Sequence, residues 1–270
     1  MRIDGHDLPT IARAAYKFGC ELGAGKMGAA SATAGAGQAL NAWGRVAAVT
    51  YSWCMEEYVS LSPYLYAQHA PIFFTSEGEL DDETMAILAS GAFDTIFFLG
   101  NPAFAPESAA ETLRGAGIEV IRFFNEDAHC INGEINAWLT KQNAEGGADV
   151  RMASNDSAGD GYGADNTASD KLIDFSHMIV CSTKSTYDAY AGCAYAGKIH
   201  AAFLLEDPTN LDSIDKAVSC IRDFKGEVKH LTFLGGDAVF NSLDKEILGK
   251  ALTQELPAMP SEKAPKKKAN

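Results

Sequence analysis

The residues best suited to contact a ligand follow short apolar runs that are typical of buried strands. Such runs occur at 46–52, 72–74 and 95–101, and similar runs occur in the second half of the chain. In a parallel α/β sheet, ligands bind beyond the carboxyl ends of the strands, where side chains and backbone amides converge. The predicted binding residues are therefore Ser52, Trp53, Glu57, Thr75, Ser76, Gly100, Asn101, Thr183, Ser185, Asp188, Glu206, Gly235, Gly236 and Asp237.

Two of these acids have a second explanation. Glu57 and Asp188 lie near expected helix starts, where the helix dipole favours a carboxylate whatever the function of the protein. Both interpretations stay open at this point. His69 and His200 occupy equivalent positions just before two apolar runs, and we expect them to serve packing or hydrogen bonding.

No motif in the sequence indicates catalysis. Catalysis needs a nucleophile with a base, a carboxylate pair or a metal cluster at usable spacing. The six Cys form no C-x-x-C pair and no zinc spacing, and the six His are scattered. Asp160, Asp165 and Asn166 lack the alternating spacing and terminal Glu of a calcium loop. We therefore expect no catalytic residue, no metal and no cofactor.

The glycine-rich stretch at 19–44 contains GAGKMG and GAGQAL. A phosphate loop would read G-x-x-x-x-G-K-[ST], and a dinucleotide fingerprint would follow a strand directly. Neither condition is met. We interpret the stretch as a flexible loop with a short helix near 39–43.

Apolar runs alternate with helical segments along the chain. For example, the segment at 80–92 opens with an acidic first turn and reaches Gly91, a suitable helix end. Strands that alternate with helices indicate a mainly parallel sheet with right-handed crossovers and helices on both faces. The predicted fold class is therefore α/β.

The pattern occurs twice, which indicates an internal duplication. Shifted by 131 positions, Val49 and Tyr64 fall on Val180 and Tyr195. Shifted by 135 positions, FLGNPA at 98–103 falls on FLGGDA at 233–238. Each copy is then one structural unit.

These residues resemble the type 2 cell-wall-binding repeat of Gram-positive surface proteins. The first copy reads EYVSLSPYLYAQHAPIFFT from Glu57, LDDET from Leu80 and TIFFLGNPAF from Thr95. The second reads DAYAGCAYAGKIHAAFLLE from Asp188 and LTFLGGDAVFNS from Leu231. The family motifs A-P-I-L-L-T and I-L-G-G correspond to parts of these segments. The family's Arg-Tyr pair is absent, because Leu8-Pro9 and Ala128-His129 stand at its two positions.

The resemblance implies two tandem Rossmann-like or Toprim-like units, at 1–121 and 122–256. It also implies a non-catalytic module that anchors a protein to the Gram-positive cell wall by binding an anionic wall polymer, polysaccharide or teichoic-acid-like. The implied location is the cell wall or extracellular surface. Because relatives carry three repeats, it further implies self-association or an additional repeat. The alternative is a Rossmann-type small-ligand or nucleotide-binding enzyme, since fold alone does not fix function.

Composition limits the remaining choices. The chain is 47% hydrophobic and 21% charged, as in a globular protein, and its formal charge of −14 disfavours a nucleic-acid partner. No apolar run is long enough to span a bilayer, and no signal peptide is evident, so the chain is expected to be cytoplasmic or a fragment of a longer exported protein. The segment at about 142–170 is expected to be a mobile loop, and 257–270 a disordered basic tail.

Overall fold

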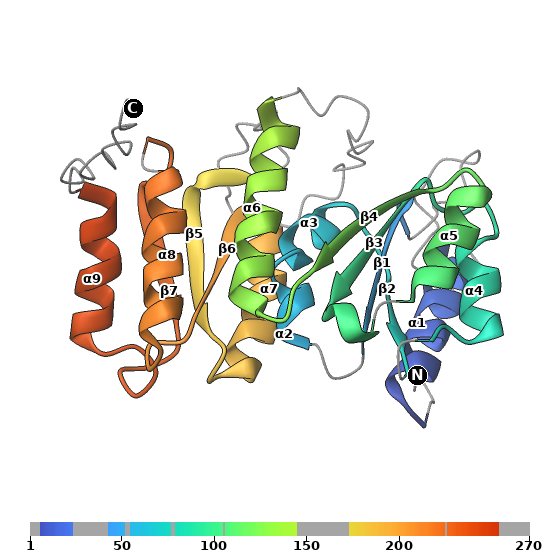
Figure 1. The fold of residues 1–270 in the computed structure, drawn as a ribbon, viewed down its shortest axis with the longest axis horizontal. Coiled ribbons are helices and arrows are strands. Elements are labelled where there is room, and N and C mark those ends of the chain that lie inside the picture. The colour runs from blue at the N-terminus through green and yellow to red at the C-terminus, as the bar shows by residue number, and fades with distance from the viewer. Residues whose placement is uncertain are drawn as a thin grey trace, which may run out of the picture.

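The computed structural model describes residues 6–23, 43–51, 55–76, 79–104, 106–144, 173–224 and 226–253. The expected helix near 39–43, the loop at about 142–170 and the tail at 257–270 lie mostly or wholly outside these ranges. Figure 1 shows two α/β units side by side. The predicted fold class, α/β with two mainly parallel sheets flanked by helices, is confirmed.

The first unit contains a four-stranded parallel sheet in the order β2-β1-β3-β4. Its strands are β1 (Val46–Tyr51), β2 (Ile72–Thr75), β3 (Thr95–Gly100) and β4 (Glu119–Phe124). Its helices are α1 (Leu8–Gly23), α2 (Met55–Val59), α3 (Ser62–Ala67), α4 (Asp82–Leu88), the 3-10 helix η1 (Pro102–Phe104) and α5 (Glu107–Gly115).

The second unit contains a three-stranded parallel sheet in the order β6-β5-β7. Its strands are β5 (Asp174–Ser182), β6 (Ala201–Glu206) and β7 (His230–Leu234). Its helices are α6 (Ala128–Ala144), α7 (Thr186–Lys198), α8 (Leu211–Asp223) and α9 (Ser242–Thr253). Among the described residues, no helix combines the length and the apolar character needed to cross a membrane.

The pairing register repeats between the two units. Val49 in β1 lies opposite Phe73 and Phe98, and Val180 in β5 lies opposite Leu204 and Phe233. Those partners are separated by the same 131 and 135 positions that relate the two halves of the sequence. Three strands of each sheet therefore share the same order and spacing, whereas β4 has no counterpart among the described strands of the second sheet.

The backbone repeats as well, and it changes the interpretation of two histidines. His69 and His200 both adopt left-handed conformations, with φ of 50° and 54°, and both side chains are exposed. Each follows the end of a helix, α3 or α7, and turns the chain into the next strand. This conformation is unusual for a residue with a side chain. Of the expected roles, packing does not apply because both side chains are exposed, but both residues form hydrogen bonds through the backbone: the His69 and His200 carbonyls accept from the Gly44 and Asp174 amides.

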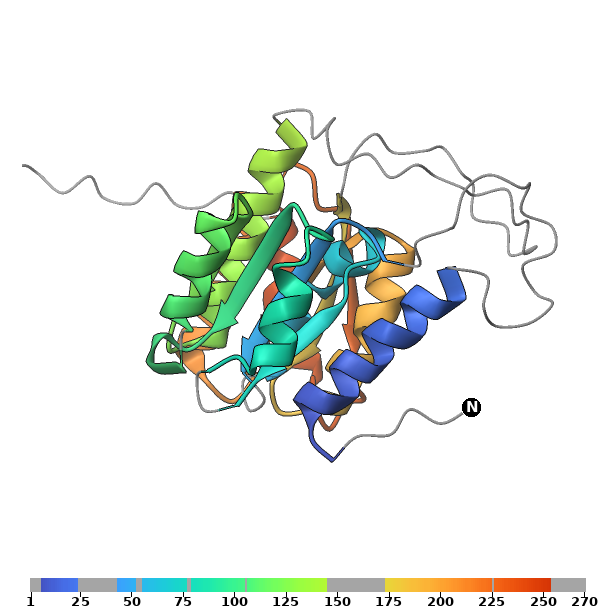
Figure 2. The same ribbon diagram turned by 90° about the vertical axis from the view of Figure 1, so that its right-hand side faces the viewer.

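Helices cover both faces of each sheet. Residues of α1, α4 and α5 pack on one face of the first sheet, and Figure 2 shows these three helices in front of it. The opposite face packs against α3 and α6. In the second unit, α7 covers one face, and α6, α8 and α9 cover the other.

The two units share one apolar core. Trp138 of α6 packs edge-on against Tyr64 and Phe97 of the first unit, with ring centroids 5.3 and 5.2 Å apart. Helices α3 and α7 also meet, and Gly197 allows this because a Cβ there would come within 2.5 Å of the Cβ of Tyr66. The boundary predicted after Ile121 falls inside β4, which pairs with β3 along its whole length.

Candidate functional site

The carboxyl ends of β5, β6 and β7 form one edge of the second unit, from which α7, α8 and α9 start (Figure 1). Residues predicted for this unit lie there: Thr183, Ser185 and Asp188 follow β5, Glu206 ends β6, and Gly235, Gly236 and Asp237 follow β7. Their side chains differ in accessibility. Asp237 is exposed, and Ser185 and Asp188 are half-buried.

The corresponding residues of the first unit are more enclosed. Thr75 ends β2 and is buried, whereas Ser76 beside it is exposed. Gly100 ends β3, and the side chain of Asn101 accepts a hydrogen bond from the Ala103 amide at 2.8 Å, which organises the turn. Glu57 lies in α2 and is half-buried. The predicted residues Ser52 and Trp53 lie outside the described residues.

Glu206 occupies an unexpected environment. Its side chain is 0% exposed, and within the described structure neither carboxylate oxygen has a hydrogen-bond partner. Burial first, and then the charges of Asp244 and Asp207, raise the pKa of Glu206 to about 7. The prediction that Glu206 contacts a ligand is therefore not supported by its position, because its oxygens do not reach solvent.

The neighbours of Glu206 are held in place by the helices that follow. Asp207 accepts hydrogen bonds from the backbone and hydroxyl of Thr209 and forms an ion pair with Lys184 at 3.1 Å. Asp244 accepts a hydrogen bond from the Asn241 amide at 2.9 Å at the start of α9. Burying a carboxylate between two others costs free energy unless it binds a proton.

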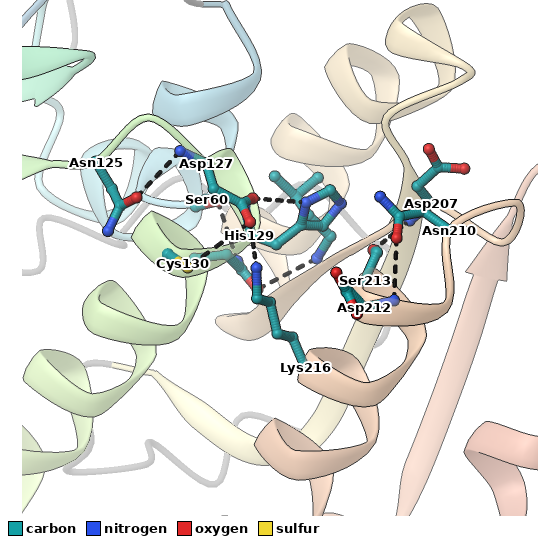
Figure 3. Close-up of polar contacts among 12 residues, drawn as sticks. Ser60, Asn125, Asp127, His129, Cys130, Asp207, Asn210, Asp212, Ser213 and Lys216 are labelled. Atoms are coloured by element: carbon teal, nitrogen blue, oxygen red, sulfur yellow. Dashed lines mark hydrogen bonds and ion pairs between the residues drawn. The ribbon is translucent and has the colours of Figure 1, made fainter.

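A second polar cluster joins the two units where β4 leads into α6. The side chain of Asp127 caps α6 by accepting from the His129 amide at 2.8 Å, as expected for an acid before a helix. It also contacts the His129 Nδ1 at 2.9 Å and forms an ion pair with Lys216 of α8. Figure 3 shows Asp127 between these two partners.

The ionisation of Asp127 follows from this geometry. Partial burial opposes the charged form, but hydrogen bonds from Lys216 and from the backbone and ring of His129 outweigh it and hold the pKa of Asp127 well below its usual range. A carboxylate with so low a pKa is a weak general base at neutral pH. The cluster is therefore better suited to fixing the helices than to proton transfer.

A groove of about 530 Å³ lies next to this cluster, between α6 and α8 above β6. Its lining includes the apolar residues Leu204, Leu205, Ala217 and Phe224 and the polar or charged residues His129, Asp215, Lys216 and Asp223. Among the described residues, no group of three or more His, Cys, Asp or Glu side chains is arranged to hold a metal ion.

The sequence analysis missed the cluster at the start of α6 because it missed β4. The charges of Glu119 and Arg122 interrupt the apolar pattern of that strand, so the polar residues after it were not recognised as strand-end residues. The apolar residues of 118–124, starting directly after Gly117, were the available signal.

The fold has known counterparts. Cwp8 from Clostridium difficile matches with a TM-score of 0.60 and 13% sequence identity, over 93% of this chain and 33% of that one. Cwp6 from Clostridium difficile matches with a TM-score of 0.40 and 13% identity, over 93% of this chain and 47% of that one. No protein-family model matches the sequence, and a comparison with curated proteins gives no match. The matched region is less than half of either structure, and the likeness to Cwp8 establishes the fold alone.

Proposed function

We propose that this chain is a non-catalytic module that attaches a protein to the Gram-positive cell wall by non-covalent binding of a wall polymer. The observation that carries the proposal is the fold match over 93% of the chain to Cwp8, a cell wall protein. The motifs at Glu57–Thr75 and Asp188–Glu206, which resemble wall-binding repeats, support it independently. The proposed location is accordingly the cell wall or extracellular surface.

The pairing and burial of the charged residues at the site favour a binding function over a catalytic one. Asp127 is engaged by Lys216 and His129, and Lys184 by Asp207. Glu206, whose pKa is raised to about 7, is buried away from solvent. A general acid or base must come within hydrogen-bond reach of the substrate. These groups are therefore either paired within the chain or buried in it.

Co-sedimentation with purified Gram-positive cell walls tests the proposal. We expect saturable pelleting of the chain with walls and none with microcrystalline cellulose, which serves as an insoluble control. A thermal-shift panel of nucleotides should leave the melting temperature unchanged. If the chain stays in solution with walls, the proposal is wrong, and a nucleotide that raises the melting temperature would favour the Rossmann-type alternative.

A further inference from the structure

Three large apolar side chains stand exposed at the carboxyl edge of the second sheet. Tyr187 is 87% exposed, Leu211 82% and Leu243 60%. Each lies in the first two residues of the helix that follows a strand: α7 after β5, α8 after β6 and α9 after β7. Scattered apolar residues are normal on a protein surface. Here an exposed apolar residue follows each of the three strands at the same edge of the sheet, which indicates a binding surface.

The three side chains approach this edge from both faces of the sheet. Tyr187 comes from α7, which packs on one face, and Leu211 and Leu243 come from α8 and α9 on the other. Figure 1 shows the three helices starting along the same side of the unit. A surface that runs across the end of a sheet suits an extended ligand better than a small molecule.

The charges at this edge restrict the chemistry of that ligand. The described part of the edge holds three lysines, and each is already paired with a carboxylate of the chain: Lys184 with Asp207, Lys216 with Asp127 and Lys245 with Asp237. An anionic polymer would have to displace these carboxylates to gain a cation. It would also face the exposed acids Asp212 and Asp237.

We propose that the edge formed by Tyr187, Leu211 and Leu243 binds an uncharged, hydroxyl-rich wall polysaccharide. This inference rests on the proposed function and names its ligand class. Sugar rings carry C–H groups on their faces, which pack on an aromatic ring and on Leu side chains. Their hydroxyls donate to carboxylates, which are pure acceptors when ionised. Asp188 and Asp212 directly follow Tyr187 and Leu211 in the chain, and the side chain of Asp212 is exposed.

The proposed ligand differs from the anionic polymer that the repeat resemblance implies. Attraction between a polyanion and lysines weakens as salt screens the charges, whereas packing on apolar groups does not. The net charge of −14 points the same way, because it adds a general repulsion toward an anionic wall polymer.

Equilibrium binding of the full chain to purified walls at 50 and 500 mM NaCl tests the ligand class. Two competitors separate the alternatives: the phosphate-free polysaccharide released from walls by hydrofluoric acid, and lipoteichoic acid as a polyanion. We expect the phosphate-free polysaccharide to displace the chain, lipoteichoic acid to leave it bound, and salt to change the Kd by less than roughly twofold.

Variants on one helix locate the surface. Tyr187→Ala should weaken wall binding roughly tenfold, as for the loss of a central aromatic contact. Tyr195→Ala is the matched control, because Tyr195 is 47% exposed near the opposite end of α7. Lys184→Gln should leave the Kd unchanged, since the proposed ligand makes no use of that charge.

The outcomes distinguish the two proposals. Wall binding that is lost at 500 mM NaCl, is competed by lipoteichoic acid and is weakened by Lys184→Gln overturns the uncharged ligand and leaves the wall-binding function standing. Binding that Tyr187→Ala and Tyr195→Ala affect equally overturns the assignment of this edge. Failure to bind walls under all conditions overturns both proposals.

Discussion

The two edge strands of the second sheet, β6 and β7, differ in the contacts that their outer sides make. All six residues of β6 are buried. Asn132 of α6 donates to the Phe203 carbonyl at 2.8 Å and accepts from the Leu205 amide at 3.2 Å, so a side-chain amide takes the place of a neighbouring strand. In contrast, β7 begins with the exposed His230 and continues with half-buried residues, and no described strand pairs with its outer side.

The equivalent strand of the first unit has a neighbouring strand on both sides, which β7 lacks. Its counterpart β3 is paired on both sides, by β1 and β4, and five of its six residues are buried. Unpaired strand edges expose backbone donors and acceptors that another chain can bind. Helix α6 thus closes one edge of the second sheet, whereas no strand within the described ranges pairs with the other edge.

The largest expected effect comes from breaking the closed edge. Asn132 is 2% exposed and also donates to Ser60 Oγ at 3.0 Å, so Asn132→Ala leaves polar groups of two units unpaired. We expect the free energy of unfolding to fall by about 3–5 kcal/mol. Glu134→Ala, on the exposed side of the same helix, should change it by less than about 0.5 kcal/mol. Urea unfolding measures both, and equal effects would show that Asn132 does not close the edge.

The next effect concerns the end of the same strand and depends on pH. The pKa of Glu206 is about 7 in the folded chain, against an ordinary value of 4.5. Between these values the folded state keeps a proton that the unfolded chain has released, so stability falls as the pH rises. Relative to Glu206→Gln, the wild-type chain should lose about 3 kcal/mol between pH 4.5 and above pH 7.

Denaturant unfolding of the two proteins across pH 4.5–8 measures this difference. The Glu206→Gln side chain keeps the size of Glu206 without its ionisation, so any pH dependence that remains comes from other groups. Parallel curves for the two proteins would mean that folding does not raise the pKa of Glu206.

The smallest effect on stability is expected at the outer edge of β7. There the main expected change is in the oligomeric state of the chain. We expect the isolated chain to self-associate through β7, with a light-scattering mass above 28.7 kDa at high concentration. A lysine on an edge strand opposes such pairing. Thr232 is half-buried in β7, and Thr232→Lys should restore the monomer mass while lowering stability by about 1 kcal/mol. A wild-type monomer at all concentrations would show that β7 is not an interface.

The sequence predicted the strands and helices that have strong periodicity. The apolar runs at 46–52, 72–74 and 95–101 coincide with β1, β2 and β3, and the helical segment at 80–92 contains α4. The 131-residue spacing between Val49 and Val180 was also visible in the sequence, and the two residues occupy equivalent positions in their sheets.

Side-chain roles were harder to predict because they depend on packing between units. Asn132 looks like an ordinary polar residue of α6, and only its position over β6 makes it an edge closure. In the sequence, Glu206 follows an apolar run and looks like an exposed strand-end acid. In the structure it is buried near Asp244 of α9, a contact that the sequence does not reveal. The exposure of Tyr187 and Leu211 likewise depends on which faces α7 and α8 bury.

Amide hydrogen exchange of the full chain, with and without phosphate-free wall polysaccharide, tests the central claim most directly. The account predicts slower exchange in three turns of the second unit, at 183–188, 208–213 and 235–243, with little change at the corresponding turns of the first unit. Protection confined to the groove between α6 and α8 or to the first unit, or no protection at saturating polysaccharide, would contradict it.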